Sequence, residues 1–501
     1  MTQQLNKKWT QGMFSTEDWW SAWLGLFFFG LGLLSIWGLD IVGWIAKPKT
    51  WEWTNLMQDF SWHKLLKTSS THYHSLHPLL SLFITYLVFA FLTGLGAYFQ
   101  KLNVRKYLYG FTIIFFLTWL AWIAGHEAHL SAINAMVKKH NYFKEYNLSW
   151  GLQLGGGASY LLALIIGLVI GNFMKNFASK IKEAAKPEWF IKTGIVLLGI
   201  KLGMMTMKAA GFTYELALAG AAAAFVAYLL FWPIVYYIGR KYFKLNRSSA
   251  AVLSSGISIC GVSASIATAG AIKAKPIIPI AVSSLILIFA MLELVALPPA
   301  LTHLSPNEPI VNGAAMGMTV KTDGADAAAG AILDQLMISK HLKQTGEQWE
   351  EGWILSAALL TKIWIDIFIG IWSFVLAIIW VRNVDRKKDQ EKIPKSEIWF
   401  RLPKFVMAYM LVWLIYLAIM YFFPEVVPSA KFGGHIVQGP YRKLMFMLTF
   451  LSIGVITDFS KLKGMGRLAI LYALALFAII APLAYAVAYL FHHGMLPPVT
   501  K

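Results

Sequence analysis

Long runs of apolar residues dominate this chain, and most of them are long enough for a helix to cross a lipid bilayer. A helix that crosses a hydrocarbon core of ~30 Å needs about 20 mostly apolar residues, and by that rule we mark about thirteen runs. They predict an all-α polytopic membrane protein. The runs lie near residues 19–39, 78–99, 108–125, 154–173, 188–207, 215–239, 248–272, 276–300, 310–336, 353–381, 404–423, 444–457 and 467–491.

The composition agrees with a chain that has lipid rather than water as its main solvent. Hydrophobic residues make up 57% of it and charged residues 14%, and the mean hydropathy is +0.58. An ordinary soluble domain is less apolar and more charged. The first apolar run has no small-residue cleavage site after it, so we expect it to stay as a span rather than be removed as a signal peptide.

The net charge of +19 suggests nucleic acid at first, but the basic residues lie mostly in short segments between the runs. In that position they set the orientation of a membrane protein. Most of the 44 Lys and Arg residues fall on the cytoplasmic side if the amino terminus is cytoplasmic and the carboxy terminus is outside. We therefore expect a lipid bilayer, and no nucleic acid, as the partner.

Several kinds of chemistry are disfavoured. Cys260 is the only cysteine, so neither a disulfide within the chain nor a multi-cysteine metal site is possible. His126 and His129 lack the H-E-x-x-H spacing of zinc proteases, and we take them and the histidines within 63–77 as solvated loop residues. No Gly-rich loop ends in Gly-Lys-Ser/Thr, so ATP is not the expected energy source. We expect no enzyme activity, no cofactor and no metal.

The amino-acid composition of the apolar runs changes near residue 150. Residues 1–150 hold about three bulky spans and are predicted to form an amino-terminal membrane extension. Residues 151–501 hold the other spans and are predicted to form a transporter core, because small residues let helices pack closely and break. The stretches 199–211 and 454–466 align at a constant offset, which hints at the internal duplication of secondary transporters, although chance similarity explains it equally well.

The run 248–272 is apolar yet crowded with Ser, Thr and Gly. Gly256, Gly261 and Gly270 favour an interrupted helix, which a membrane tolerates only where the freed backbone groups line a cavity. Such a break aims helix N–H groups at an anion. A continuous helix with a Gly/Ser face is the alternative. The substrate-binding candidates here are Ser254, Ser258, Cys260, Gly261 and Ser263.

The runs 310–336 and 353–381 place ionisable groups where lipid is expected. A buried charge costs several kcal/mol unless it is paired or hydrated, so it marks either a transport site or a structural ion pair. Basic groups suit an anion, whereas carboxyl groups carry protons or sodium; Glu293 carries less weight because it falls near a span end. Substrate-binding candidates are Thr319, Lys321 and Lys362, and coupling-ion candidates are Asp323, Asp326 and Asp366.

Three stretches resemble the YeiH-like family of bacterial sulfate exporters, which are inner-membrane proteins. They are Gly167-Leu-Val-Ile-Gly-Asn172, Lys192-Thr-Gly-Ile-Val-Leu-Leu-Gly199 and Gly256-Ile-Ser-Ile-Cys-Gly-Val-Ser-Ala264. The resemblance covers about two thirds of the chain, residues 151–490. It implies an inverted-repeat transporter with broken, crossing helices that exports sulfate or an organosulfonate.

This chain departs from the family pattern at two positions. The family's Ser-Ile-His-Asp is replaced by Thr319-Val-Lys-Thr-Asp323, and Ile365 stands where the family has Arg. We therefore hypothesise a secondary transporter of the bacterial inner membrane that exports a small anion, coupled to protons or sodium. A cation/proton antiporter of the same fold is the alternative, and a homodimer is one assembly that the sequence leaves open.

Overall fold

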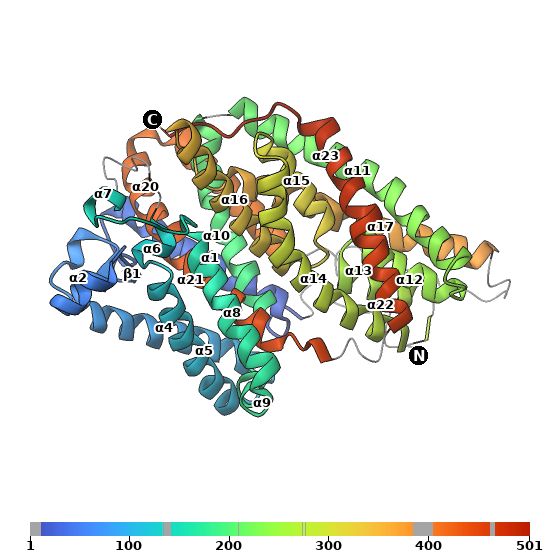
Figure 1. Cartoon of the computed structure of the whole chain (residues 1–501), viewed down its shortest axis with the longest axis horizontal. Coiled ribbons are helices and arrows are strands. Elements are labelled where there is room, and N and C mark those ends of the chain that lie inside the picture. The colour runs from blue at the N-terminus through green and yellow to red at the C-terminus, as the bar shows by residue number, and fades with distance from the viewer. Residues whose placement is uncertain are drawn as a thin grey trace.

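The computed structural model describes residues 12–132, 134, 142–208, 210–272, 274–275, 277–383, 404–460 and 466–500. Within these ranges the chain is mostly helical, and every predicted run contains a helix. The helices α2 and α4 lie toward one end of the long axis and α12 and α22 toward the other, with α10 and α16 between them (Figure 1).

The first 186 residues contain a small hairpin of strands among the helices. The strands β1 and β2 pair antiparallel, with Lys47 opposite Lys67. The elements are α1 (Glu17–Leu33), η1 (Leu34–Trp37), β1 (Ala46–Pro48), α2 (Trp53–Gln58), α3 (Trp62–Leu65), β2 (Leu66–Thr68), η2 (Thr71–Tyr73), α4 (Pro78–Phe99), α5 (Val104–Ala124), α6 (Ala128–Ser131), α7 (Tyr142–Glu145), α8 (Gly157–Phe173) and α9 (Lys175–Ile181).

The rest of the described chain is helical. The elements are α10 (Pro187–Lys208), α11 (Ala210–Lys241), α12 (Arg247–Ser258), α13 (Gly261–Ala271), α14 (Ile277–Leu304), α15 (Pro309–Thr319), α16 (Asp323–Thr345), α17 (Trp353–Asn383), α19 (Lys404–Phe422), η3 (Pro424–Val426), α20 (Val427–Ile436), η4 (Val437–Tyr441), α21 (Arg442–Ile456), α22 (Gly466–Ala473), η6 (Leu474–Ile480) and α23 (Ala481–His492). The segments η4 and η6 are π-helical and join the helices on either side of them.

Fewer helices than predicted qualify as spans on length and composition alone. Six helices of the described chain do so, or seven if α8 and α9, which meet at 114°, form one broken span. The prediction of about thirteen spans counted runs that the structure divides. For example, the run 248–272 forms helices of 12 and 11 residues, and a helix of that length rises only about 16–18 Å.

The helix ends define two faces of the molecule. On the face that we call the cavity face, Lys175 at the start of α9 lies 3.2 Å from Asp458, just after α21. On the face that we call the C-terminal face, the backbone N–H of Glu350 donates to the carbonyl of Pro498 at 2.7 Å. His493 Nδ1 lies 2.6 Å from Glu308 Oε1 on that same face.

Two of the predicted spans are helical hairpins. One break lies between α12 and α13 at 259–260, where the glycines of the run 248–272 favoured it, and the other lies between α15 and α16 at 320–322. In both cases the second helix folds back beside the first. Thr268 Oγ1 donates to Ser255 Oγ at 2.8 Å, and Asn312 Nδ2 lies 3.4 Å from Met337 Sδ. The expectation that each run crosses the membrane as one broken helix is therefore wrong.

The two hairpins enter from opposite faces. Hairpin 2 (α15 and α16) begins after Glu308 and ends just before Glu350, both on the C-terminal face. Helix α11 starts there too, because Phe212 packs on Trp353 with ring centres 5.0 Å apart. Its 32 residues extend about 48 Å to the cavity face. Hairpin 1 (α12 and α13) follows directly and so enters from the cavity face.

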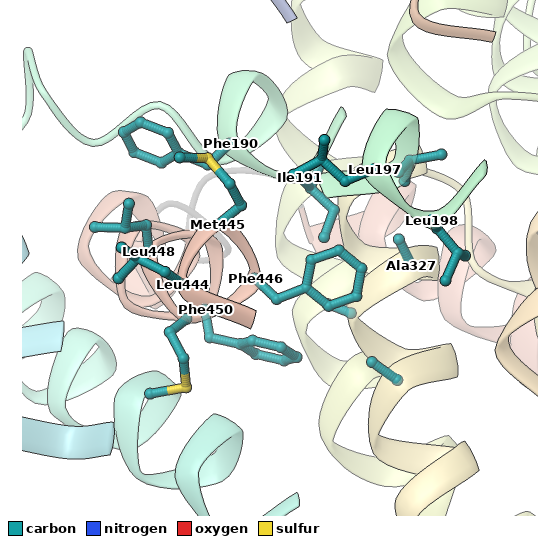
Figure 2. Close-up of a cluster of buried hydrophobic side chains, with 14 of the residues drawn as sticks. Phe190, Ile191, Leu197, Leu198, Ala327, Leu444, Met445, Phe446, Leu448 and Phe450 are labelled. Atoms are coloured by element: carbon teal, nitrogen blue, oxygen red, sulfur yellow. The ribbon is translucent and has the colours of Figure 1, made fainter. Parts of the chain in front are cut away.

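Large apolar side chains from α10 and α21 pack together at the centre of the molecule. Figure 2 shows Phe190, Leu197, Phe446 and Phe450 in this cluster, with Ala327 of α16 beside them. The same continuous core includes side chains from α1 and α5. The predicted division at residue 150 stays a prediction.

Glycines bring the backbones of α8 and α21 into contact. A Cβ atom built on Gly167 would lie 2.9 Å from Gly454 Cα and would also clash with the Leu451 carbonyl oxygen. Only a residue without a side chain fits at this crossing.

We expect Gly167→Ala to lower the melting temperature of the purified protein by several degrees, because overpacking of this kind costs about 1–3 kcal/mol. Differential scanning fluorimetry in detergent measures the change. Gly30→Ala is the matched control, since a Cβ atom there has no neighbour within 4 Å. Equal melting temperatures for the two variants would contradict the close crossing.

Candidate functional site

The tips of the two hairpins meet inside the protein. Cys260 Sγ at the tip of hairpin 1 donates to Asp323 Oδ1 at the tip of hairpin 2, over 3.2 Å. A Cβ atom built on Gly261 would lie 2.5 Å from the carbonyl oxygen of Lys321. Gly261, a predicted site residue, therefore allows backbone to approach backbone at the contact.

Glycine packing brings Lys362 to the end of α15. Helix α15 lies against α17 at Gly313 and at Gly317, where an added Cβ atom would clash with the carbonyl oxygens of Ile354 and Ala358 respectively. The second contact lies one helical turn beyond the first on both helices. The next turn brings Lys362 to the carbonyl end of α15.

The Lys362 ammonium group binds the carbonyl ends of both hairpins. Its Nζ atom donates to the carbonyls of Ile259 and Val320, both at 3.2 Å, and the side chain is buried. These carbonyls follow the last turns of α12 and α15, where the helix dipole is negative. Two of the three ammonium N–H groups are thus already used, which leaves little of Lys362 for the predicted role in attracting an anion.

Lys321 occupies a different environment from Lys362. Its side chain is fully buried and its ammonium group donates to the Met318 carbonyl in its own chain segment. The Nζ atom lies 5.8 Å from the centre of the Phe231 ring on α11. The two lysines that were predicted to act together therefore contact different partners.

Three predicted side chains form a compact group at the tips. Acceptor atoms of Cys260, Asp323 and Asp366 all lie within 4.8 Å of one another. Two carboxylates so close repel each other in a buried site, so the pair favours binding a proton or a cation. The thiol is a poor ligand for a hard ion such as sodium, which prefers oxygen. This geometry suits the predicted coupling role, with a proton as the better fit.

The other predicted site residues either bond within their own helix or have no partner that the structure describes. The Ser254 and Thr319 hydroxyls donate to the carbonyls of Ala250 and Ala315 in their own helices, both at 2.7 Å. Ser258 Oγ and both oxygens of Asp326 are buried and have no hydrogen-bond partner among the residues that the structure describes. The side chain of Ser263 lies outside the described part of the chain.

A cavity reaches the tip of hairpin 2 from the cavity face. It encloses about 650 Å³ of empty space, including its open mouth. Most of its wall is apolar, and its polar lining includes two carboxylates. The lining residues are Pro187, Glu188, Ile288, Ala290, Met291, Thr322, Ala325, Ile453, Ile456, Thr457 and Asp458.

Ionic contacts hold the C-terminal face together. Glu351, before α17, lies 3.4 Å from Arg442 Nη2 and 3.8 Å from Lys443 Nζ on α21. The positive charge of Lys443 has the largest effect on Glu351, and together with the charges of Lys201 and Arg442 it holds the pKa of the Glu351 carboxyl well below its usual range. The Asp334 carboxylate of α16 accepts the N–H of Gly352 at 2.9 Å and so caps α17.

Known proteins share this chain's sequence over most of its length. The profile of the family described as Conserved hypothetical protein 698 matches residues 148–473. A UPF0324 membrane protein of Nitrosomonas europaea is 57% identical over 495 residues, which is 99% of each chain. The chain belongs to the UPF0324 family of membrane proteins. No solved structure matches it.

More distant UPF0324 relatives share a smaller part of their length. One from Rhodopirellula baltica is 32% identical over 402 residues, which is 77% of this chain and 64% of the relative. One from Nitratidesulfovibrio vulgaris is 29% identical over 416 residues, or 81% and 63%. The matched profile includes both hairpins, Lys362 and Asp366. The names support a membrane protein and do not support the predicted sulfate-exporter label.

Sequence reasoning missed two polar residues of this UPF0324 site. Glu188, in the first turn of α10, lines the cavity. Asn312 of α15 donates to the Ser305 carbonyl at 2.7 Å. Glu293 of α14, which had little weight, is fully buried, and its carboxylate has no hydrogen-bond partner within the described ranges.

We expect Lys362→Met to lower the melting temperature by several degrees, because the Ile259 and Val320 carbonyls lose their charged donor. Hydrogen bonds to charged groups contribute about 1.5–3 kcal/mol. Thermal unfolding in detergent tests this against Lys64→Met, whose ammonium group is 39% exposed on the surface. A Lys362→Met protein as stable as the control variant would mean that Lys362 does not hold the tips.

Proposed function

We propose that this UPF0324 protein is a secondary transporter that moves a small anion together with protons across the bacterial inner membrane. The observation that carries the proposal is the meeting of two opposed helical hairpins around Lys362, within reach of a cavity. Non-helical backbone is tolerated at membrane depth only where it is buried in protein or lines a cavity. An amino terminus in the cytoplasm and an inverted repeat belong to the same proposal.

The anion is favoured by the amino-terminal helix ends at the tips. The amino-terminal ends of α13 and α16 begin at Gly261 and Asp323, where the two tips touch. Their partial positive charge attracts an anion, whereas Lys362 already neutralises the two carbonyl ends. The resemblance to sulfate exporters supplies sulfate and organosulfonates as candidate substrates.

The protons are assigned to Asp323, Asp326 and Asp366. An ionised carboxylate at the tips repels an anion, and a protonated one does not. Proton and anion therefore bind together and move in the same direction. Efflux then requires the anion to be more concentrated inside the cell, since the proton gradient across the inner membrane opposes it.

A cation/proton antiporter is the second candidate. The observation that favours it is the number of buried carboxyl groups near the tips. Asp326, Asp366 and Glu293 are all less than 4% exposed, against two buried lysines, one of which is bonded to carbonyls. In that case the same carboxyl groups exchange protons for a cation.

We expect proteoliposomes that contain the protein to accumulate labelled sulfate or taurine when the outside is more acidic than the lumen. One coupled proton concentrates the anion about tenfold per pH unit. Asp366→Asn should abolish this accumulation while leaving exchange of labelled for unlabelled anion in place, because the proton carrier is lost but the anion site is kept.

Asp59→Asn is the matched control, because Asp59 lies on the surface with its side chain 77% exposed. Failure of any small anion to show saturable transport would refute the proposal. Sodium-dependent proton release that Asp366→Asn abolishes, without any response to sulfate, would establish the antiporter instead.

A further inference from the structure

The amino-terminal end of α16 faces the cavity. Thr322 and Ala325 both line it. Thr322 caps the helix, since its hydroxyl oxygen accepts the Ala325 N–H at 3.2 Å. Other N–H groups of the first turn have no partner within the helix, and together they carry its positive end. This end is the part of the tips that an anion from the cavity reaches first.

A carboxylate from another helix already lies at this end. A Cβ atom built on Gly324 would lie 2.8 Å from Glu188 Oε1 and 3.3 Å from Glu188 Cδ. Glu188 belongs to the first turn of α10 and lines the same cavity, with its side chain 36% exposed. Because residue 324 has no side chain, the carboxylate approaches the helix closely.

Glu188 also has a second partner close by. Its Oε2 atom lies 3.7 Å from Lys192 Nζ, one turn further along α10, and Lys192 Nζ lies 3.6 Å from Asp18. The carboxylate can therefore leave α16 by a rotation of its own side chain and keep its ion pair. Other charged groups near it are Glu17 and Asp323, with Asp458 in the cavity wall.

We propose that Glu188 is a tethered competitor for the substrate. In the empty protein its carboxylate takes the position at the amino-terminal end of α16 that an anion takes during transport, and the anion must displace it. This inference rests on the proposed anion transport and adds to it a residue outside the hairpins. It also explains why residue 324 is a glycine, because a side chain there would hold the Glu188 carboxylate away from the end of α16.

The test is a sulfate titration of the full-length protein in detergent at constant ionic strength, read as the rise in melting temperature. We expect Glu188→Gln to lower the half-saturating sulfate concentration about two- to fivefold, since interactions with a helix dipole contribute about 0.3–1 kcal/mol. Glu188→Asp keeps the charge but shortens the side chain by one methylene, so it should move in the same direction as Glu188→Gln.

Glu183→Gln is the matched control, because Glu183 lies on the cavity face outside the cavity and accepts the Asn103 N–H at 3.0 Å. An unchanged or higher half-saturating concentration in Glu188→Gln overturns the inference. So does a Glu188→Asp protein that behaves as the wild type, because charge alone would then explain the effect. The wild-type titration decides separately whether the proposed anion binding exists, and without it both proposals fail.

Discussion

Free backbone groups in a buried place are the constraint on which this structure depends. Each hairpin interrupts a helix in the interior, and every interruption leaves carbonyl and N–H groups without a partner in the helix. Away from water such groups cost several kcal/mol each. The protein meets this cost by bringing the two tips together, so that Lys362 donates to carbonyls from both. The buried charges are therefore placed by the helix ends that they neutralise.

Glycine residues determine how α15 and α17 are aligned along their length. Gly313 and Gly317 let α15 lie directly on α17, and the next turn carries Lys362 to the carbonyl end of α15. Asp366 follows one turn later and joins Asp323 at the amino-terminal ends. One helix thus presents a cation to the negative ends of the hairpins and a carboxyl group near the positive ends.

The sequence predicted the position of one break but not the hairpins. Glycine and serine around Gly261 favour a helix that stops there, because composition is a local property of the chain, whereas the charges around Asp323 indicated a site rather than a break. Whether the next helix continues across the membrane or folds back depends on contacts between distant residues, such as Thr268 with Ser255. No local pattern records that choice.

The roles of the charged residues were predicted less well than their importance. Lys362 was expected to attract an anion, and in the structure its N–H groups donate to the carbonyls left free at the ends of α12 and α15. Glu188 had no predicted role. Its place in the site depends on α10 lying beside the start of α16, which the sequence does not show.

The two faces are closed by different kinds of contact. On the cavity face the path to hairpin 2 is lined mainly by apolar side chains and is already open. On the C-terminal face Glu351, Arg442 and Lys443 close the molecule through charges. Arg442 is buried in this group, so breaking its pair with Glu351 costs more than breaking an exposed pair, which contributes only about 0–1 kcal/mol. The C-terminal face is therefore held by charges that depend on one another, whereas the cavity face is held by apolar packing around an opening.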